Sequence, residues 1–156
     1  MTESNQKDLN PTLPAVALWL GYLGLIPFVV LSFCSSFGVE VDWFGVLNTE
    51  QALLSYAAII ITFIGAVHWG IALSSSGSLN KSIHYLYSVI PSLLAWGLLF
   101  LPVKVSLYGM VLALIGLYLV DRALLSSVQT KNYLTLRLHL TVVAGLSMAI
   151  AGVTAG

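Results

Sequence analysis

The residues of this sequence that could do chemistry are few, and they lie near the ends of apolar stretches. They combine imidazole, carboxylate, guanidinium and aromatic side chains: His68, Trp69, His84, Tyr87, Asp121 and Arg137. Histidine can exchange a proton or hold a metal ion, and a carboxylate can pair with a guanidinium group. We interpret the six as a candidate binding cluster. We expect neither a catalytic residue nor a metal ligand among them, because the sequence contains no complete catalytic or metal-binding motif.

Five predominantly apolar stretches must position these residues. They are residues 12–36, 51–74, 82–101, 105–125 and 134–153. The hydrocarbon core of a bilayer is about 30 Å thick, and a helix needs about 20 apolar residues to cross it. With 58% hydrophobic residues, 8% charged residues and a mean hydropathy of +0.95, the chain has too little polar surface for a soluble globule. The sequence therefore predicts an all-α, polytopic membrane protein with a five-helix transmembrane bundle.

The basic residues predict how this bundle is oriented. Five of the six lie in or beside the N-terminal tail, the second loop and the fourth loop, on one side of a five-span chain: Lys7, Lys81, Arg122, Lys131 and Arg137. Lys104 alone lies on the other side. Because cytoplasmic loops carry the excess of Lys and Arg, we expect residues 1–11 to form a cytoplasmic tail. Residues 12–156 would then form one transmembrane domain with its C-terminus outside.

Alternating helices would bring the ionisable residues of different spans to one depth, close to the cytoplasmic surface. Such groups are expensive inside a membrane, so we expect them to face one another rather than lipid. Helical periodicity puts His68, His84 and Arg137 on faces with small or polar neighbours. His139 instead shares its face with bulky apolar residues, so we expect it at the lipid headgroups. Between adjacent helices we predict an ion pair of Asp121 with Arg137.

Small residues follow one side of the second span, where they would let another helix approach closely. This side carries Ser55, Ala58, Thr62, Gly65, Ala66 and Gly70. The opposite side carries Leu53, Ile60, Phe63, Ile64, Val67 and Ile71. We predict that the small side faces the bundle and that the bulky side faces lipid.

Two prolines and one capping residue predict local features of the spans. Pro27 and Pro91 fall inside predicted helices. Proline in a helix removes a hydrogen bond and releases the carbonyl group four residues earlier, so Pro27 would release the carbonyl of Leu23. A released carbonyl can accept a hydrogen bond from a neighbouring helix or from a ligand. Asn48 precedes Gln51 by three residues, a spacing typical of a helix cap, so we expect the second span to begin there.

Five short stretches resemble a known family. They are residues 21–28 (GYLGLIPF), 63–70 (FIGAVHWG), 87–92 (YSVIPS), 121–122 (DR) and 136–138 (LRL). In this order they resemble the transmembrane protein 69-like family of small multispan membrane proteins of bacteria and mitochondria, which carry a domain of unknown function. The run that contains His68 and Trp69 is the most specific. The resemblance implies an integral inner-membrane location, and it implies no activity, cofactor or catalytic residue.

Several kinds of function fit such a protein. We expect a structural or accessory membrane protein, or a factor that helps assemble a larger inner-membrane complex, rather than an enzyme. One alternative is a redox protein that binds a quinone or haem through the histidines with Arg137 or Tyr87. A second alternative is a small oligomeric transporter or proton-relay protein. The expected partners are membrane lipids, other inner-membrane proteins and further copies of the chain, while the zero net charge argues against nucleic acid. We expect the bacterial inner membrane, or the mitochondrial inner membrane in a eukaryote.

Overall fold

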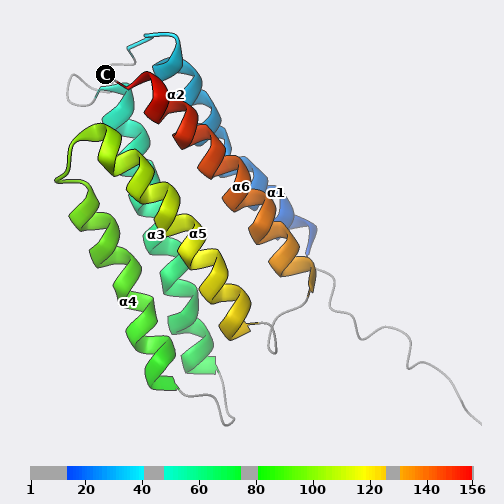
Figure 1. Cartoon of the computed structure of the whole chain (residues 1–156). Helices are drawn as coiled ribbons and strands as arrows, with labels where there is room; N and C mark the ends of the chain where they lie inside the picture. The colour runs from blue at the N-terminus through cyan, green and yellow to red at the C-terminus, as the bar shows by residue number, and fades with distance from the viewer. Residues whose placement is uncertain (1–13, 41–47, 75–80, 126–130, 156) are drawn as a thin grey trace, which may run out of the picture.

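The computed structural model describes residues 14–40, 48–74, 81–125 and 131–155. Within these ranges the chain forms helices and short connections, without a strand. The helices are α1 (Ala15–Leu23), α2 (Ile26–Ser36), α3 (Thr49–Ser74), α4 (Lys81–Leu98), α5 (Val103–Leu125) and α6 (Lys131–Thr154). α1 and α2 run in the same direction one after the other, and α3, α4, α5 and α6 then alternate in direction, so α1 begins and α6 ends at opposite ends of the bundle (Figure 1). The predicted all-α, polytopic membrane fold is confirmed.

The helices have the length and surface of a multi-pass membrane protein. Four segments of the described chain are long and apolar enough to cross a membrane: Ala15–Ser36, Thr49–Ser74, Val103–Leu124 and Asn132–Thr154. The remaining predicted span, α4, is more polar, since its 18 residues include Lys81, His84 and several serines. It nevertheless lies alongside α3 and α5 (Figure 1). Large apolar side chains such as Trp19 and Phe63 are about 70% exposed, as expected where lipid replaces water.

The first predicted span is broken into two helices. α1 ends at Leu23 and α2 begins at Ile26, which places Pro27 in the first turn of α2, where its missing N–H group removes no helical hydrogen bond. The expectation of a proline inside one continuous helix is therefore wrong. At the break the carbonyl oxygen of Gly24 accepts a hydrogen bond of 2.9 Å from the Tyr56 hydroxyl of α3. A neighbouring helix thus satisfies a carbonyl that the break releases.

The connection from α2 to α3 has defined caps at both ends. Gly38 adopts the left-handed conformation with φ of 63°, and the amide of Val39 donates to the carbonyl of Cys34, as in a Schellman motif. Before α3, the side-chain oxygen of Asn48 accepts a hydrogen bond of 2.8 Å from the amide of Gln51. The predicted helix cap is confirmed, and α3 begins at the residue that follows it.

α3 occupies a central position and packs against α2, α4 and α5. Its buried side chains therefore do not form the single small face that the sequence predicted. Ala58 and Gly65 are buried as expected, but three other members of the small side are exposed: Thr62, Ala66 and Gly70. Two members of the bulky side are buried instead: Leu53 and Ile64. A helix with neighbours on several sides buries large and small residues alike, so the predicted division between bundle and lipid is wrong for α3.

α3 and α4 are in close contact at Gly65. A Cβ atom at this position would lie 2.9 Å from the backbone oxygen of Ser88 and 3.0 Å from Cγ of Pro91. Both belong to the buried face of α4, and a backbone atom cannot move aside without moving its helix. The contact therefore requires glycine, and it fixes the separation of the two helices within one turn of His68.

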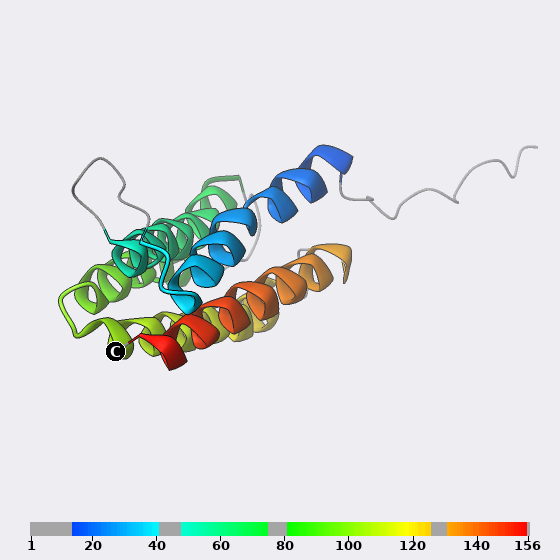
Figure 2. The same ribbon diagram turned by 90° about the horizontal axis from the view of Figure 1, so that it is seen from above.

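α1 and α2 make different contacts with the C-terminal helix. α2 packs closely against α6, whereas α1 touches it only slightly. Seen from above, α1 and the beginning of α6 diverge from each other (Figure 2). The bundle is thus tight near the end of α6 and looser where α1 begins.

Candidate functional site

Four ionisable side chains from four helices meet in one polar cluster, formed by His68, His84, Asp121 and Arg137. Nε2 of His68 lies 2.9 Å from Oδ1 of Asp121. Nε and Nη2 of Arg137 donate to Oδ2 of the same carboxylate at 2.9 and 2.6 Å. On the other side, Nδ1 of His68 lies 3.0 Å from Nδ1 of His84. The predicted ion pair of Asp121 with Arg137 is confirmed, and the two histidines extend it to α3 and α4.

The polar cluster is buried within the bundle. His68 is 0% exposed, Asp121 1%, His84 3% and Arg137 7%. The four residues lie three to six positions from the nearer ends of their helices, or about 5 to 9 Å along the helix axes. Alternating helices therefore do bring them to one depth near one end of the bundle, as the sequence predicted.

The helix faces that carry His84 and Arg137 are the ones predicted from their spacing. His84 shares a buried face of α4 with Ser88, Pro91 and Ala95. Arg137 shares a buried face of α6 with the residues that follow it at helical spacing: Thr141, Ala144, Met148 and Ala151. Residues four apart lie one turn apart on the same side of a helix, so the buried faces that carry His84 and Arg137 both point into the bundle.

Hydrogen-bond requirements assign the protons of the polar cluster. Asp121 is paired with the guanidinium group of Arg137 and is therefore an ionised acceptor, so Nε2 of His68 carries a proton. In a neutral ring Nδ1 of His68 is then an acceptor, and Nδ1 of His84 must donate to it. The result is a directional chain from His84 through His68 to Asp121. With both rings neutral its net charge is zero, because the carboxylate and the guanidinium cancel.

The two histidines are too close together to hold a haem iron between them. Each bond from a metal ion to an imidazole nitrogen is about 2 Å long, so two nitrogens on opposite sides of one ion are about 4 Å apart. The Nδ1 atoms of His68 and His84 are 3.0 Å apart, and the rings stack with an angle of 23° between their planes. This geometry fits a direct hydrogen bond rather than paired axial ligands.

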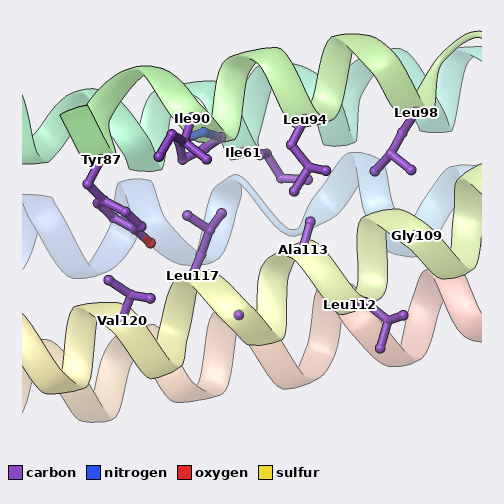
Figure 3. Close-up of a pocket in the computed structure, with 12 residues that line it drawn as sticks. Ile61, Tyr87, Ile90, Leu94, Leu98, Gly109, Leu112, Ala113, Leu117 and Val120 are labelled. Carbon is purple, nitrogen blue, oxygen red and sulfur yellow. The ribbon is translucent and has the colours of Figure 1, made fainter.

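Tyr87 joins the polar cluster through its ring. The ring packs edge-on against His68, with centroids 4.6 Å apart. Its hydroxyl is buried and has no hydrogen-bond partner among the described residues. Tyr87 also borders a groove of about 440 Å³ between α3, α4 and α5, where its side chain points from α4 towards α5 (Figure 3). The other side chains along this groove, such as Leu94 and Leu117, are apolar.

Trp69 lies outside the polar cluster that the other candidates form, and a binding role for it stays a prediction. Its side chain is 48% exposed and packs edge-on against Tyr85 on the outer surface of α3 and α4. Consecutive residues of a helix point about 100° apart, so Trp69 cannot share the inward direction of His68. The other five candidates come together, while their role as a binding site stays a prediction.

His139 is exposed, as its spacing predicted. Its Nδ1 lies 3.3 Å from the hydroxyl of Tyr22, which belongs to α1. It therefore takes no part in the polar cluster, although it is only two residues from Arg137.

One polar residue beside the polar cluster was not among the candidates. Thr141 is 7% exposed, and its hydroxyl has no partner within the described ranges. It follows Arg137 by four residues, and this helical spacing is the feature of the sequence that could have identified it as a neighbour of the polar cluster. Threonine is common in membrane helices, however, and the lack of a partner is visible only in three dimensions.

Comparisons with known proteins agree on one family. The family model described as "Protein of unknown function (DUF3429)" matches residues 13–153. The chain is also 33% identical over 141 residues to Transmembrane protein 69 from Xenopus tropicalis, and the alignment covers 86% of this chain and 53% of that protein. The chain thus spans about half the length of this relative. No solved structure matches.

Proposed function

This chain belongs to the DUF3429 family of proteins of unknown function, and from the geometry of its polar cluster we propose that it is an accessory protein of an inner membrane. In this role it supports the assembly or stability of a larger membrane complex and catalyses no reaction itself. The membrane is the bacterial inner membrane or, in a eukaryote, the mitochondrial inner membrane.

The observation that carries this proposal is that the residues of the polar cluster form their hydrogen bonds with one another. His68, Asp121 and Arg137 bond to one another, and His84 bonds to His68. Ionisable groups that act on a substrate need contact with it, whereas these four are at most 7% exposed. Their pairing joins α3, α4, α5 and α6, which is the expected effect of polar groups that hold membrane helices together.

The outer surface supports a role in association with other membrane components. It carries large apolar side chains on every helix, and bulky residues such as Phe33, Trp96 and Phe100 are more than 60% exposed. Such a surface suits lipid, other membrane proteins or further copies of the chain. In the membrane, close packing of helices provides the attraction, because lipid is as apolar as the side chains.

The test is a deletion strain examined by native electrophoresis of its solubilised inner membranes. We expect at least one membrane complex to be lost or to assemble more slowly, and the wild-type gene to restore it. The His139→Ala variant should also restore it, because His139 lies outside the polar cluster. The Arg137→Ala variant should not.

The proposal fails if all complexes assemble normally without the protein. It also fails if cross-linking in intact membranes, followed by purification in mild detergent, recovers this chain alone. Protein levels must be measured for each variant, so that loss of the Arg137→Ala chain itself is distinguished from loss of its effect.

A second candidate is a quinone-associated redox protein, and one observation favours it. The hydroxyl of Tyr87 is buried without a described partner, beside His68 and at the border of the groove between α4 and α5. A quinone carbonyl could accept a hydrogen bond from it. Purified protein would then contain a lipid-soluble quinone, and Tyr87→Phe would reduce its amount. Protein that contains no quinone would remove this candidate.

A further inference from the structure

A second cavity lies between α1, α2, α3 and α6, with Leu114 of α5 also in its wall. It has a volume of about 480 Å³, which lies within the range of small-molecule sites, roughly 300 to 1,000 Å³. Its walls are largely apolar and include Leu20, Phe63 and Leu140. The polar side chains among its described lining residues, here called its border, all belong to α6: Tyr133, Arg137 and Thr141. The cavity is therefore amphipathic, as a site for a molecule with a polar head and a hydrocarbon tail would be.

Thr141 has a buried hydroxyl at this border with no hydrogen-bond partner among the described residues. Its side chain is more than nine-tenths buried and lines the cavity, and its hydroxyl bonds to no described group. A buried hydroxyl without a partner is unfavourable, whereas replacement by an apolar group of the same shape can be neutral or stabilising. The hydroxyl thus has an unused hydrogen bond to give to an acceptor inside the cavity.

The charges at the border select the type of acceptor. Arg137 borders the cavity, but its guanidinium group is already neutralised by Asp121 at 2.6 Å. Among the described residues that line the cavity there is no Asp, Glu or Lys. An anionic headgroup would therefore bring an unbalanced charge into a region of low dielectric constant, which is costly. A neutral acceptor, such as a carbonyl oxygen, needs no balancing charge.

We propose that this cavity binds a neutral, membrane-soluble molecule through a carbonyl oxygen that accepts a hydrogen bond from Thr141. Its hydrocarbon tail lies against Leu20 and Phe63 of the cavity wall. An isoprenoid quinone and a neutral glyceride ester both have this chemistry. The site is distinct from the groove beside Tyr87, and it does not depend on the accessory role proposed above.

The experiment measures binding of two neutral probes to the purified full chain in detergent by native mass spectrometry. The probes are a benzoquinone with a ten-carbon tail and dioleoylglycerol, and an anionic lipid, phosphatidylglycerol, is measured beside them. We expect the wild-type protein to bind at least one neutral probe and to prefer it over the anionic lipid. The probe that binds distinguishes the quinone from the ester.

Three variants separate the site from general effects on the protein. Thr141→Val removes the hydroxyl and keeps the shape, and it should weaken binding about three- to tenfold. Thr154→Val makes the same change on α6 at a hydroxyl that bonds to the carbonyl of Ala151, outside the cavity, and should leave binding unchanged. Ala17→Phe places a large side chain on the cavity wall and should abolish binding.

Three outcomes would overturn the proposal. In the first, neither neutral probe binds to the wild-type protein. In the second, Thr141→Val and Ala17→Phe both bind the probes as tightly as the wild type. In the third, phosphatidylglycerol binds more tightly than both neutral probes, which would contradict the argument from charge.

Discussion

Replacing Gly65 by alanine should weaken the contact between α3 and α4 and thereby disturb the polar cluster. The added Cβ would lie 2.9 Å from the Ser88 oxygen and 3.0 Å from Pro91, whereas ordinary contacts begin at 3.4 Å. Since the nearest atom belongs to the backbone, the helices must separate. Overpacking of this kind costs about 1 to 3 kcal/mol of the free energy of unfolding. One turn away, the 3.0 Å contact between His68 and His84 should lengthen.

The matched control for this variant is Gly70→Ala on the same helix. A Cβ at Gly70 would meet nothing within 4 Å, so this change should have only the helix-propensity effect, a gain of up to about 1 kcal/mol. Reversible unfolding of both variants in mixed detergent micelles, followed by circular dichroism, gives the two free energies. The imidazole ¹⁵N spectrum gives the state of the histidines. A Gly65→Ala protein as stable as Gly70→Ala, with an unchanged histidine spectrum, would refute the reasoning.

Two further predictions concern single side chains. His68→Ala should impair function or bundle stability more than His139→Ala, because of these two histidines only His68 is buried and bonded to Asp121. If both variants complemented a deletion equally well, this prediction would be contradicted. Tyr56→Phe should lower the free energy of unfolding by about 1 kcal/mol, since it removes the hydrogen bond to Gly24 at the break between α1 and α2. Unfolding in micelles measures this loss, and a variant with wild-type stability would show that the broken span does not need that bond.

The features that the sequence predicted correctly follow from periodicity and from alternation of the helices. The apolar stretches of bilayer length coincide with the observed helices to within a few residues, apart from the break between α1 and α2 in the first stretch. Because successive spans run in opposite directions, residues near those span ends that meet at one end of the bundle lie at one depth. Helical spacing then separated inward-facing Arg137 from outward-facing His139, and the ion pair with Asp121 followed.

The features that the sequence could not predict depend on which helices become neighbours. α3 has three neighbouring helices, so the direction of its small residues did not identify its buried face. The hydrogen bond between His68 and His84 requires α3 and α4 to approach at Gly65, and the break at Gly24 is stabilised by Tyr56 from another helix. Trp69 is next to His68 in sequence but points in a different direction, because consecutive residues of a helix are about 100° apart.

The central claim is that the buried polar cluster holds the helices together, and a double-mutant cycle on Asp121 and Arg137 tests it most directly. Asp121→Asn and Arg137→Gln each leave one buried charge without its partner, which should cost about 3 to 5 kcal/mol of the free energy of unfolding. The double variant removes both charges, so its loss should be smaller than the sum of the two by about 2 kcal/mol or more. Losses that add to within about 0.5 kcal/mol would show that the two residues act independently and would contradict the account.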